Sequence, residues 1–202
     1  MTMRVVVDNG PGKRRASAGR SLKSAPPQVG LRAAMAADAP ALHALIASHL
    51  EEGRLLPRTL DELTIHASRF VVAVAGEQIV GCAELAPLSP DVAEVRSLVV
   101  SRGARRLGVG VRMVDELSVR ARREGYRRLT AFAHDPAFFV RRGFSIVPHT
   151  WVPEKIAHDC TACPLFRNCG QYAVVLALDR ASVERSSNLR RTAGGPPAPA
   201  DV

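Results

Sequence analysis

The stretch from Glu94 to Glu124 constrains the fold of this chain more than any other. Glu94 to Val100 is a β-branched, apolar run bounded by polar residues, which is typical of a buried strand. A short basic loop follows from Ser101 to Leu107. From Gly108 onward, apolar residues recur at spacings of three and four, as they do on one face of a helix. The stretch therefore predicts a buried strand that leads through a basic loop directly into an amphipathic helix.

The loop before this helix has the chemistry of a diphosphate site. Its last part, RRLGVG, has the form R-x-x-G-x-G. The first N–H groups of a helix have no intrahelical partner, and the helix dipole adds partial positive charge there. Gly108 and Gly110 lack a Cβ, so phosphates can approach the backbone closely, and Arg105 and Arg106 place full charges beside them. We therefore expect this loop to cradle a pyrophosphate.

Two better-known phosphate loops do not fit this pattern. A dinucleotide fingerprint needs G-x-G-x-x-G near a first strand, and a nucleoside-triphosphate loop needs Gly-Lys followed by Ser or Thr. Here the glycines come in mid-chain, after three earlier strand-like runs, and an arginine precedes them.

Length and composition favour one folded domain between two tails. The chain has 202 residues, 47% of them hydrophobic, which supports a sizeable core. The region 1–28 is rich in Gly, Pro and Ser, and it holds six basic residues against Asp8 alone. We expect disordered tails over 1–28 and 181–202, with the domain over 29–180.

The formal charge of +9 does not predict a nucleic-acid surface. The first tail carries a net +5 and the second +1, so the domain between them keeps only +3. No apolar run approaches the roughly 20 residues that span a bilayer, and the N-terminal segment is too short for a secretory signal. We therefore expect a cytoplasmic protein without membrane or nucleic-acid partners.

Periodicity and turn residues predict the element order β-α-α-β-β-β-α-β-α-β-β. This order indicates an α/β fold in which helices flank a mixed, largely antiparallel sheet. Helices are expected from a cap at Asp38 to about Glu51, after a cap at Thr59, from Gly108, and from Asp135 or Pro136. The expected strands are Val29–Ala33, Phe70–Ala75, Ile79–Leu88, Glu94–Val100, Arg127–His134, Phe144–Pro148 and Gln171–Leu178.

Two segments resemble a known family. Glu94 to Gly110 resembles motif A of the GNAT superfamily of N-acetyltransferases, and Phe138 to Phe144, FFVRRGF, resembles motif B, a short helix that ends in Gly-Phe. The resemblance extends over roughly residues 29–178. Three segments are also similar to bacterial N-acetylglutamate synthases: LLPRTLDEL at 55–63, EVRSLVV at 94–100 and PAFF at 136–139.

The resemblance implies the GNAT fold and acetyl-CoA as acetyl donor. It further implies transfer to the α-amine of L-glutamate, the first step of arginine biosynthesis. The implied cofactor contacts are the backbone of the strand, the phosphate loop and one motif B aromatic, that is Leu98, Val99, Val100, Arg105, Arg106, Gly108, Val109, Gly110, Val111 and Phe139.

Glu94 is the candidate general base. It begins the strand whose far end meets the phosphate loop, so at ~3.3 Å per residue it lies about one pantetheine length from the phosphates. A carboxylate there can take the proton of the acceptor ammonium, through a water, and the resemblance assigns the base to this position. The alternative is a solvent-facing glutamate at the strand edge.

The general acid is where the sequence departs from the family. Many members carry a tyrosine at the position of Phe139, which cannot donate, and the synthases often have Ser or Thr where this chain has Ala133. His134 follows directly and is the candidate acid, with Tyr172 or water as alternatives.

Arginines are the candidate residues that bind the acceptor, because guanidinium groups pair bidentately with carboxylates. Arg58 matches the family arginine that contacts the amino-acid substrate, and Arg96 is a second candidate. On a regular strand Arg96 shares a face with Glu94 and Leu98. Ser97 lies where the family offers substrate contacts. The alternative for Arg96 is a solvated surface arginine.

A cysteine cluster near the C-terminus has the spacing of metal ligands. Cys160 and Cys163 form C-x2-C, and Cys169 and His158 could complete four ligands. A second C-x2-C pair is missing and acetyl transfer needs no metal, so half-buried, reduced thiols are the preferred interpretation and no metal is assigned. Cys82, flanked by apolar residues, is expected in the core.

Two other functions stay open at this point. The chain could acetylate another small amine or a protein N-terminus. It could also be a non-catalytic module that binds coenzyme A or senses metal or redox state. The synthases commonly assemble, so a homodimer is possible, but the sequence shows no diagnostic interface and does not give the oligomeric state.

Overall fold

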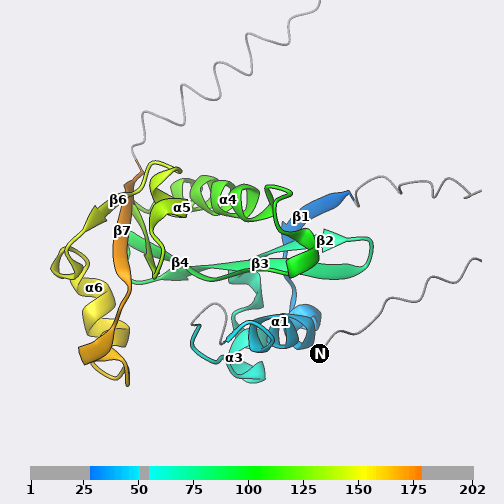
Figure 1. Ribbon diagram of the computed structural model, residues 1–202, viewed down its shortest axis with the longest axis horizontal. Coiled ribbons are helices and arrows are strands. Elements are labelled where there is room, and N and C mark those ends of the chain that lie inside the picture. The colour runs from blue at the N-terminus through cyan, green and yellow to red at the C-terminus, as the bar shows by residue number, and fades with distance from the viewer. Residues whose placement is uncertain (1–27, 51–54, 179–202) are drawn as a thin grey trace, which may run out of the picture.

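A seven-stranded sheet organises the residues that the structure, a computed structural model, describes, which are 28–50 and 55–178. The strand order is β1-β2-β3-β4-β5-β7-β6, and β4 and β5 are the parallel pair among antiparallel neighbours. The predicted mixed, largely antiparallel α/β fold is confirmed (Figure 1). In chain order the elements are β1 (Val29–Ala33), α1 (Ala39–Ala47), α3 (Leu60–Ile65), β2 (Phe70–Ala75), β3 (Gln78–Pro87), β4 (Val92–Val100), α4 (Val109–Arg123), β5 (Arg128–Ala133), α5 (Ala137–Val140), β6 (Ser145–Val147), α6 (Pro153–Lys155) and β7 (Tyr172–Ala177).

Helices cover both faces of this sheet (Figure 1). On one face α4 buries Met113 and Leu117 against strand residues such as Val95 and Leu129. On the other face α1 and α3 bury Leu42, Ile46 and Leu63 against Phe70 and Val72. Each face of the sheet therefore has its own apolar core, and β4 lies between the two. Among the described residues, no helix has the length and apolar character to cross a membrane.

Of the two side-chain caps predicted for the first helices, the structure confirms one. The Thr59 hydroxyl accepts a hydrogen bond from the Glu62 amide at 3.2 Å, as a helix cap should. Asp38, by contrast, does not cap α1 with its side chain. Its carboxylate accepts from Arg32 at 2.6 Å and from the Met35 amide at 2.9 Å, because this arginine on β1 offers a charged partner.

Some predicted boundaries lie outside the described residues. Helix α1 ends at Ala47, and the expected end near Glu51 falls in the segment 51–54. The tails predicted over 1–28 and 181–202 also lie outside them, apart from Gln28, as do the last two residues of the predicted domain.

A bulge in β4 positions the functional site. Cys82 pairs with Val99 and Glu84 pairs with Arg96, so β4 has one residue more than β3 between these pairs. Ser97 provides it with a φ of 48°, in the left-handed region that non-glycine residues seldom adopt. Past the bulge the alternation of side chains is reversed. The prediction that Leu98 shares a face with Arg96 is therefore wrong: Leu98 packs on the α4 side.

The same region of β4 separates from β5. The parallel pairing covers Val92 to Val95 and ends at the pair of Val95 with Ala131, whereas β5 continues beside β7 to Ala133. The next residues of β4 therefore have backbone groups that are not used by β5, and the two strands open into a cleft.

Candidate active site

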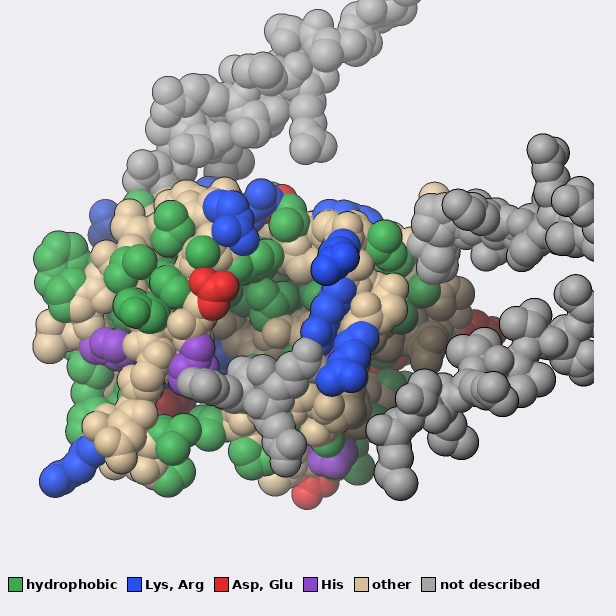
Figure 2. Space-filling model, viewed as in Figure 1, with side chains coloured by type: hydrophobic (Ala, Val, Ile, Leu, Met, Phe, Trp, Pro, Cys, Tyr) green, Lys and Arg blue, Asp and Glu red, His purple; other side chains and the backbone are tan. Residues whose placement is uncertain are grey.

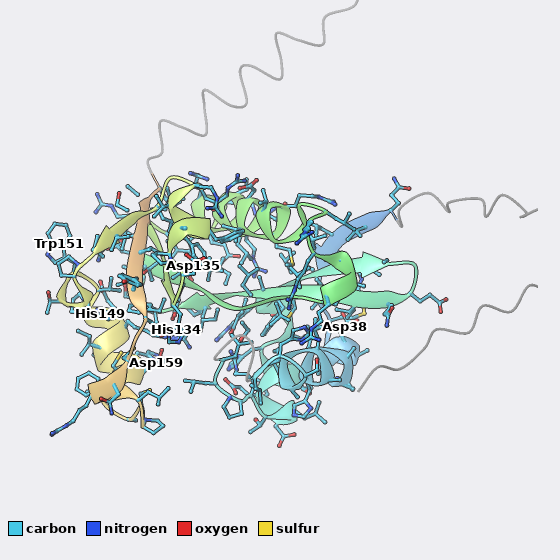
Figure 3. The ribbon with its side chains drawn as sticks, viewed as in Figure 1. Asp38, His134, Asp135, His149, Trp151 and Asp159 are labelled. Atoms are coloured by element: carbon cyan, nitrogen blue, oxygen red, sulfur yellow. The ribbon has the colours of Figure 1, made fainter. Side chains whose placement is uncertain are left out.

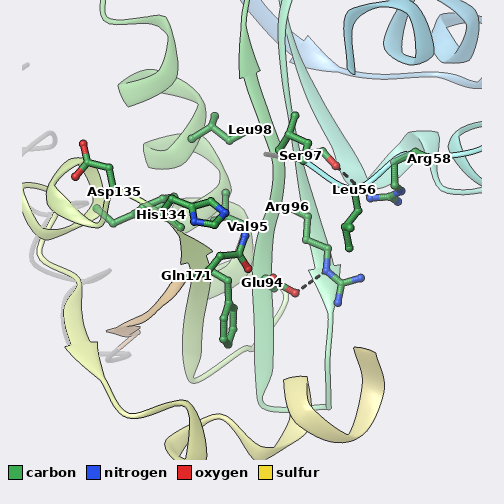
Figure 4. A pocket seen from close by; sticks show the side chains of 14 residues that line it. Leu56, Arg58, Glu94, Val95, Arg96, Ser97, Leu98, His134, Asp135 and Gln171 are labelled. Carbon is green, nitrogen blue, oxygen red and sulfur yellow. Dashed lines mark hydrogen bonds and ion pairs between the residues drawn. The ribbon is translucent and has the colours of Figure 1, made fainter. Parts of the chain in front are cut away.

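The cleft between β4 and β5 has a volume of about 410 Å³ and brings seven of the fifteen predicted site residues together (Figure 4). These seven lie in its wall: the proposed base and acid, the three proposed substrate contacts, Leu98 and Phe139. The complete lining is Leu55, Leu56, Arg58, Glu94, Val95, Arg96, Ser97, Leu98, Phe132, Ala133, His134, Asp135, Phe139 and Gln171.

Glu94 is buried at the base of the cleft, with only 3% of its surface exposed. Both of its carboxylate oxygens lie 2.9 Å from Lys155 Nζ, and Oε2 also accepts from Arg96 Nε at 2.5 Å. Glu94 is thus not the solvent-facing residue of the alternative interpretation. Since both oxygens already accept charged hydrogen bonds, a proton from an acceptor amine would reach this carboxylate most simply through a water.

Lys155 and Asp159 were missed by the sequence analysis. Asp159 Oδ2 accepts from Lys155 Nζ at 2.8 Å and from Arg96 Nη2, which joins both residues to the Glu94 site. Their spacing of four, after the helix-starting Pro153, was a signal that they share one face. Nothing in the sequence indicated which strand that face would meet.

Arg58 reaches the cleft from the segment before α3, but carboxylates already hold its guanidinium. Nη1 donates to Glu84 Oε2 at 2.8 Å and to Ser97 Oγ at 3.2 Å, and Nε lies 2.8 Å from Glu62 Oε1. Burial acts to lower the pKa of Arg58, but the hydrogen bond and charge of Glu84 raise it above its usual range. Arg58 is therefore a fixed cation, and the buried Glu84 that fixes it was not predicted.

His134 follows β5 and points from the end of that strand toward β4 (Figure 4). Its Nδ1 lies 3.1 Å from the carbonyl oxygen of Gly170. Because a carbonyl oxygen only accepts, this contact assigns the ring proton to Nδ1. A neutral His134 thus offers Nε2 as an acceptor, and it can donate from Nε2 only as an imidazolium. Figure 3 places His134 and Asp135 together, above the segment that carries Asp159.

The loop before α4 has the geometry expected of an anion cradle. Gly108 is the N-cap of the helix with φ of 71°, and the Arg112 amide donates to its carbonyl at 3.0 Å. The amides of the three residues before Arg112 therefore precede the first helical hydrogen bond. Val109 is 1% exposed, so its side chain belongs to the core and only its backbone can bind a ligand. Gly110 and Val111 are half-buried beside it.

Two arginines flank this helix start. Arg105 donates from Nε to the Val100 carbonyl at 3.1 Å, and Arg106 adopts a φ of 65°. Both are exposed. Basic side chains gather over the loop between β4 and α4 in Figure 2. The strand end, the helix amides and the positive charges thus meet at one place.

Phe139 belongs to an aromatic cluster rather than to the acid–base chemistry. It is 6% exposed, and its ring centroid lies 5.1 Å from that of Phe138 and 5.2 Å from that of Phe144. Phe139 is the member of this cluster that lines the cleft, where it adds apolar surface beside α5.

The clustered thiols line a second cavity of about 380 Å³, which shares Phe132 and Gln171 with the cleft. Cys160, Cys163 and Cys169 are free thiols. Within the ranges 28–50 and 55–178, no three His, Cys, Asp or Glu residues are grouped as a metal site would require.

Comparison with known proteins agrees with this geometry. The sequence profile of the family described as "Acetyltransferase (GNAT) family" matches residues 39–144. An uncharacterised N-acetyltransferase of Chlorobaculum tepidum is 31% identical over 148 residues, which are 73% of this chain and 96% of that protein.

Two relatives from Neisseria are longer. The amino-acid acetyltransferase of Neisseria meningitidis is 33% identical over 65% of this chain and 30% of that protein. The structure of N-acetylglutamate synthase from Neisseria gonorrhoeae, complexed with coenzyme A and N-acetyl-glutamate, superposes with a TM-score of 0.68 at 30% identity. That match covers 76% of this chain and 36% of the synthase, so the chain spans about a third of each Neisseria relative.

The profile match, the Chlorobaculum relative and the cleft between the separating strands lead to the same assignment. This chain belongs to the acetyltransferase (GNAT) family, and it is an N-acetyltransferase that takes its acetyl group from acetyl-CoA.

Proposed function

We propose that the acceptor of this acetyltransferase is the α-amine of L-glutamate, as in the first step of arginine biosynthesis. One observation carries the proposal: the Glu94 carboxylate is buried in the wall of the cleft. It belongs to β4, the strand that leads to the N-terminus of α4. The Neisseria synthase structure holds N-acetyl-glutamate together with coenzyme A, which supports this acceptor. Because the chain spans only about a third of that synthase, the acceptor is a proposal.

Acetyl-CoA fits this cleft in one direction. Its diphosphate lies on the amides of Val109 to Val111, with Arg105 and Arg106 beside it. The pantetheine arm pairs with the backbone of Leu98 to Val100, which β5 leaves unused. Glu94 is six residues before Val100, about 20 Å along a strand, so the thioester lies near the base.

The reaction then needs few protein groups. The acceptor ammonium loses a proton toward Glu94 through a water, and the free amine attacks the thioester carbonyl carbon. A backbone N–H of β4 stabilises the oxyanion as the C–N bond forms. The C–S bond breaks, the thiolate takes a proton from the imidazolium of His134, and the acceptor nitrogen gives up its second proton to the neutral imidazole as the amide forms. Across the whole reaction, one ammonium group and one thioester give one amide, one thiol and one released proton. Arg58, Arg96 and Ser97 orient the acceptor.

Free thiol release with L-glutamate tests the proposal, with Glu94→Gln as the principal variant. A positioned general base contributes about 10²–10⁴-fold, so kcat should fall by that range while coenzyme A still binds. Arg58→Ala should act on the KM for the acceptor. Glu116→Gln, on the exposed face of α4, is the matched control and should behave as the unaltered protein. If the unaltered protein releases no thiol with glutamate, the proposed acceptor is wrong.

A second candidate is another small amine or a protein N-terminus. One observation favours it: Arg58 and Arg96 are already paired with carboxylates of the protein, which leaves little free positive charge for a dicarboxylate. A panel of amino acids, polyamines and short peptides in the same assay decides between the two acceptors. Light scattering on the same preparation measures the oligomeric state and tests whether the chain forms a homodimer.

A further inference from the structure

Four charged side chains form a network between the cleft, which Glu94 and Arg96 line, and the second cavity, which Lys155 and Asp159 line. They are here called the charged quartet. Lys155 bridges the two carboxylates, and Arg96 contacts both as well. The four are not equally enclosed. The side chain of Glu94 is 4% exposed, whereas that of Asp159 is 30% exposed. Glu94 is therefore the fixed member of the quartet and Asp159 the accessible one.

Asp159 has the binding mode of a carboxylate ligand. A single oxygen, Oδ2, accepts from the Arg96 guanidinium, which lines the cleft, and from the Lys155 ammonium, which lines the adjoining second cavity. Burial would raise the pKa of Asp159, but the hydrogen bond and charge of Lys155 and the charge of Arg96 hold it below its usual range. Asp159 is thus an anion at neutral pH, held by the two cations that an acceptor carboxylate would need.

The segment that carries Asp159 is weakly bonded along its backbone. It forms a π-helical turn from Ile156 to Cys160, a geometry that is rare and frequent at functional sites. The hydrogen bonds from the Ile156 amide to Val152 and from the Thr161 amide to Ile156 are 3.4 Å long, beyond the usual range. Asp159 also lines the second cavity of about 380 Å³, which gives its carboxylate room outside the quartet.

The two cations, by contrast, are held independently of Asp159. Lys155 Nζ contacts both oxygens of Glu94 and lies 5.3 Å from the centroid of the Phe132 ring. Arg96 donates to Glu94 from Nε. With Asp159 in place the quartet is neutral. With Asp159 displaced it carries one surplus positive charge, which matches one carboxylate of an acceptor.

We propose that Arg96 and Lys155 are the carboxylate subsite for the acceptor, and that Asp159 occupies this subsite until an acceptor carboxylate displaces it. The inference rests on the proposed function, and it names the residues by which that site recognises a carboxylate of its substrate. It also explains how a cleft whose arginines are all paired can receive an anionic amino acid.

The test compares Asp159→Asn with Glu154→Gln. Both remove one negative charge from the same segment, but Glu154 pairs with Arg128, away from the quartet. Glutarate, a dicarboxylate without an amine, is the probe, titrated calorimetrically into the full chain loaded with coenzyme A. We expect Asp159→Asn to bind glutarate at least threefold more tightly than the unaltered protein, and Glu154→Gln to bind it as the unaltered protein does. The KM for L-glutamate should fall in parallel.

Equal or weaker glutarate binding by Asp159→Asn would overturn the proposal. If that variant does not fold, Lys155→Met decides, because the proposal requires it to lose glutarate binding. Retained binding by Lys155→Met would overturn the proposal as well. The titration needs no turnover, so the two proposals fail separately. Tighter glutarate binding without glutamate turnover keeps the subsite and rejects the acceptor, and turnover without tighter binding rejects the subsite alone.

Discussion

Cys82 lies fully buried in β3, and this burial raises the pKa of its thiol to about 12. The three clustered cysteines, in contrast, are half-buried. Since thiol reagents attack the thiolate, we expect Ellman's reagent at pH 8 to modify three thiols in the folded protein and the fourth only in denaturant. A fourth thiol that reacts at the same rate without denaturant would contradict this burial.

The same thiol makes the free energy of unfolding depend on pH in the alkaline range. Above the ordinary value of 9, an unfolded Cys82 loses its proton while the folded one keeps it. The free energy of unfolding should therefore fall as pH rises from 9 toward 12, by at most about 1.4 kcal/mol per pH unit for this group. Urea unfolding between pH 8 and 10.5 measures this slope. Cys82→Ala should have a shallower slope, and equal slopes in both proteins would reject the assignment.

Single residues also set the limit of what the sequence could predict at the site. The run from Glu94 to Val100 predicted the strand correctly, and Glu94 is buried in it, whereas its role as general base stays a prediction. It carried no glycine to mark a bulge, because Ser97 takes the left-handed φ itself. The faces of Arg96 and Leu98 were therefore beyond prediction. Lys155 and Asp159 were beyond it for another reason, since their contacts to β4 span about 60 positions of the chain.

At the level of elements, the start of α4 is where glycine geometry and ligand binding meet. Gly108 has φ of 71°, and a Cβ added to it would meet nothing within 4 Å. Gly108→Ala should therefore cost only the left-handed backbone penalty, about 1–2 kcal/mol, without a clash. The added methyl group would stand where phosphates approach the helix amides, so we expect the Kd of coenzyme A to rise severalfold, measured by calorimetry.

Gly76, in the turn between β2 and β3, is the matched control. It has φ of 61° and equally open surroundings. Gly76→Ala should lose a similar unfolding free energy and keep the affinity for coenzyme A. If Gly108→Ala and Gly76→Ala bind coenzyme A with equal affinity, the phosphate loop is not part of the cofactor site.

Elements with strong local signals were predicted well, and those without were not. Periodicity indicated α4, and the glycines, prolines and apolar runs indicated all seven strands within a few residues. The segment from α6 to the π-helical turn has no helical period long enough to detect. Its cysteine spacing drew attention to the thiols, for which no metal was assigned, and gave no sign that the segment brings Lys155 into contact with Glu94.

For the whole molecule, the order of strands depends on contacts that no local pattern encodes. β7 is last in sequence but lies between β5 and β6. Beside it, β5 continues to pair with β7 up to Ala133, whereas the pairing of β4 with β5 ends at Val95, and this difference opens the cleft. The resemblance of two motifs implied the fold class, but the position of the bulge and the register needed the structure.

The division of charge along the whole chain leads to a last prediction. The strands and the three apolar clusters of the part of the chain that the structure describes lie within residues 28–178, and we propose that this fragment is the folded unit. Residues 1–27 hold six basic and one acidic residue, and residues 179–202 hold four basic and three acidic, so the fragment keeps +3 of the formal charge of +9. At 0.5 M salt, surface charges are screened within a few ångströms, and both proteins should bind coenzyme A with equal Kd. At 20 mM salt the more positive full chain should bind this anion severalfold more tightly.

Calorimetry at both salt concentrations and thermal unfolding check the expectation. A fragment that unfolds more than 10 °C lower, or that loses coenzyme A binding at high salt, would place part of the folded unit beyond these boundaries.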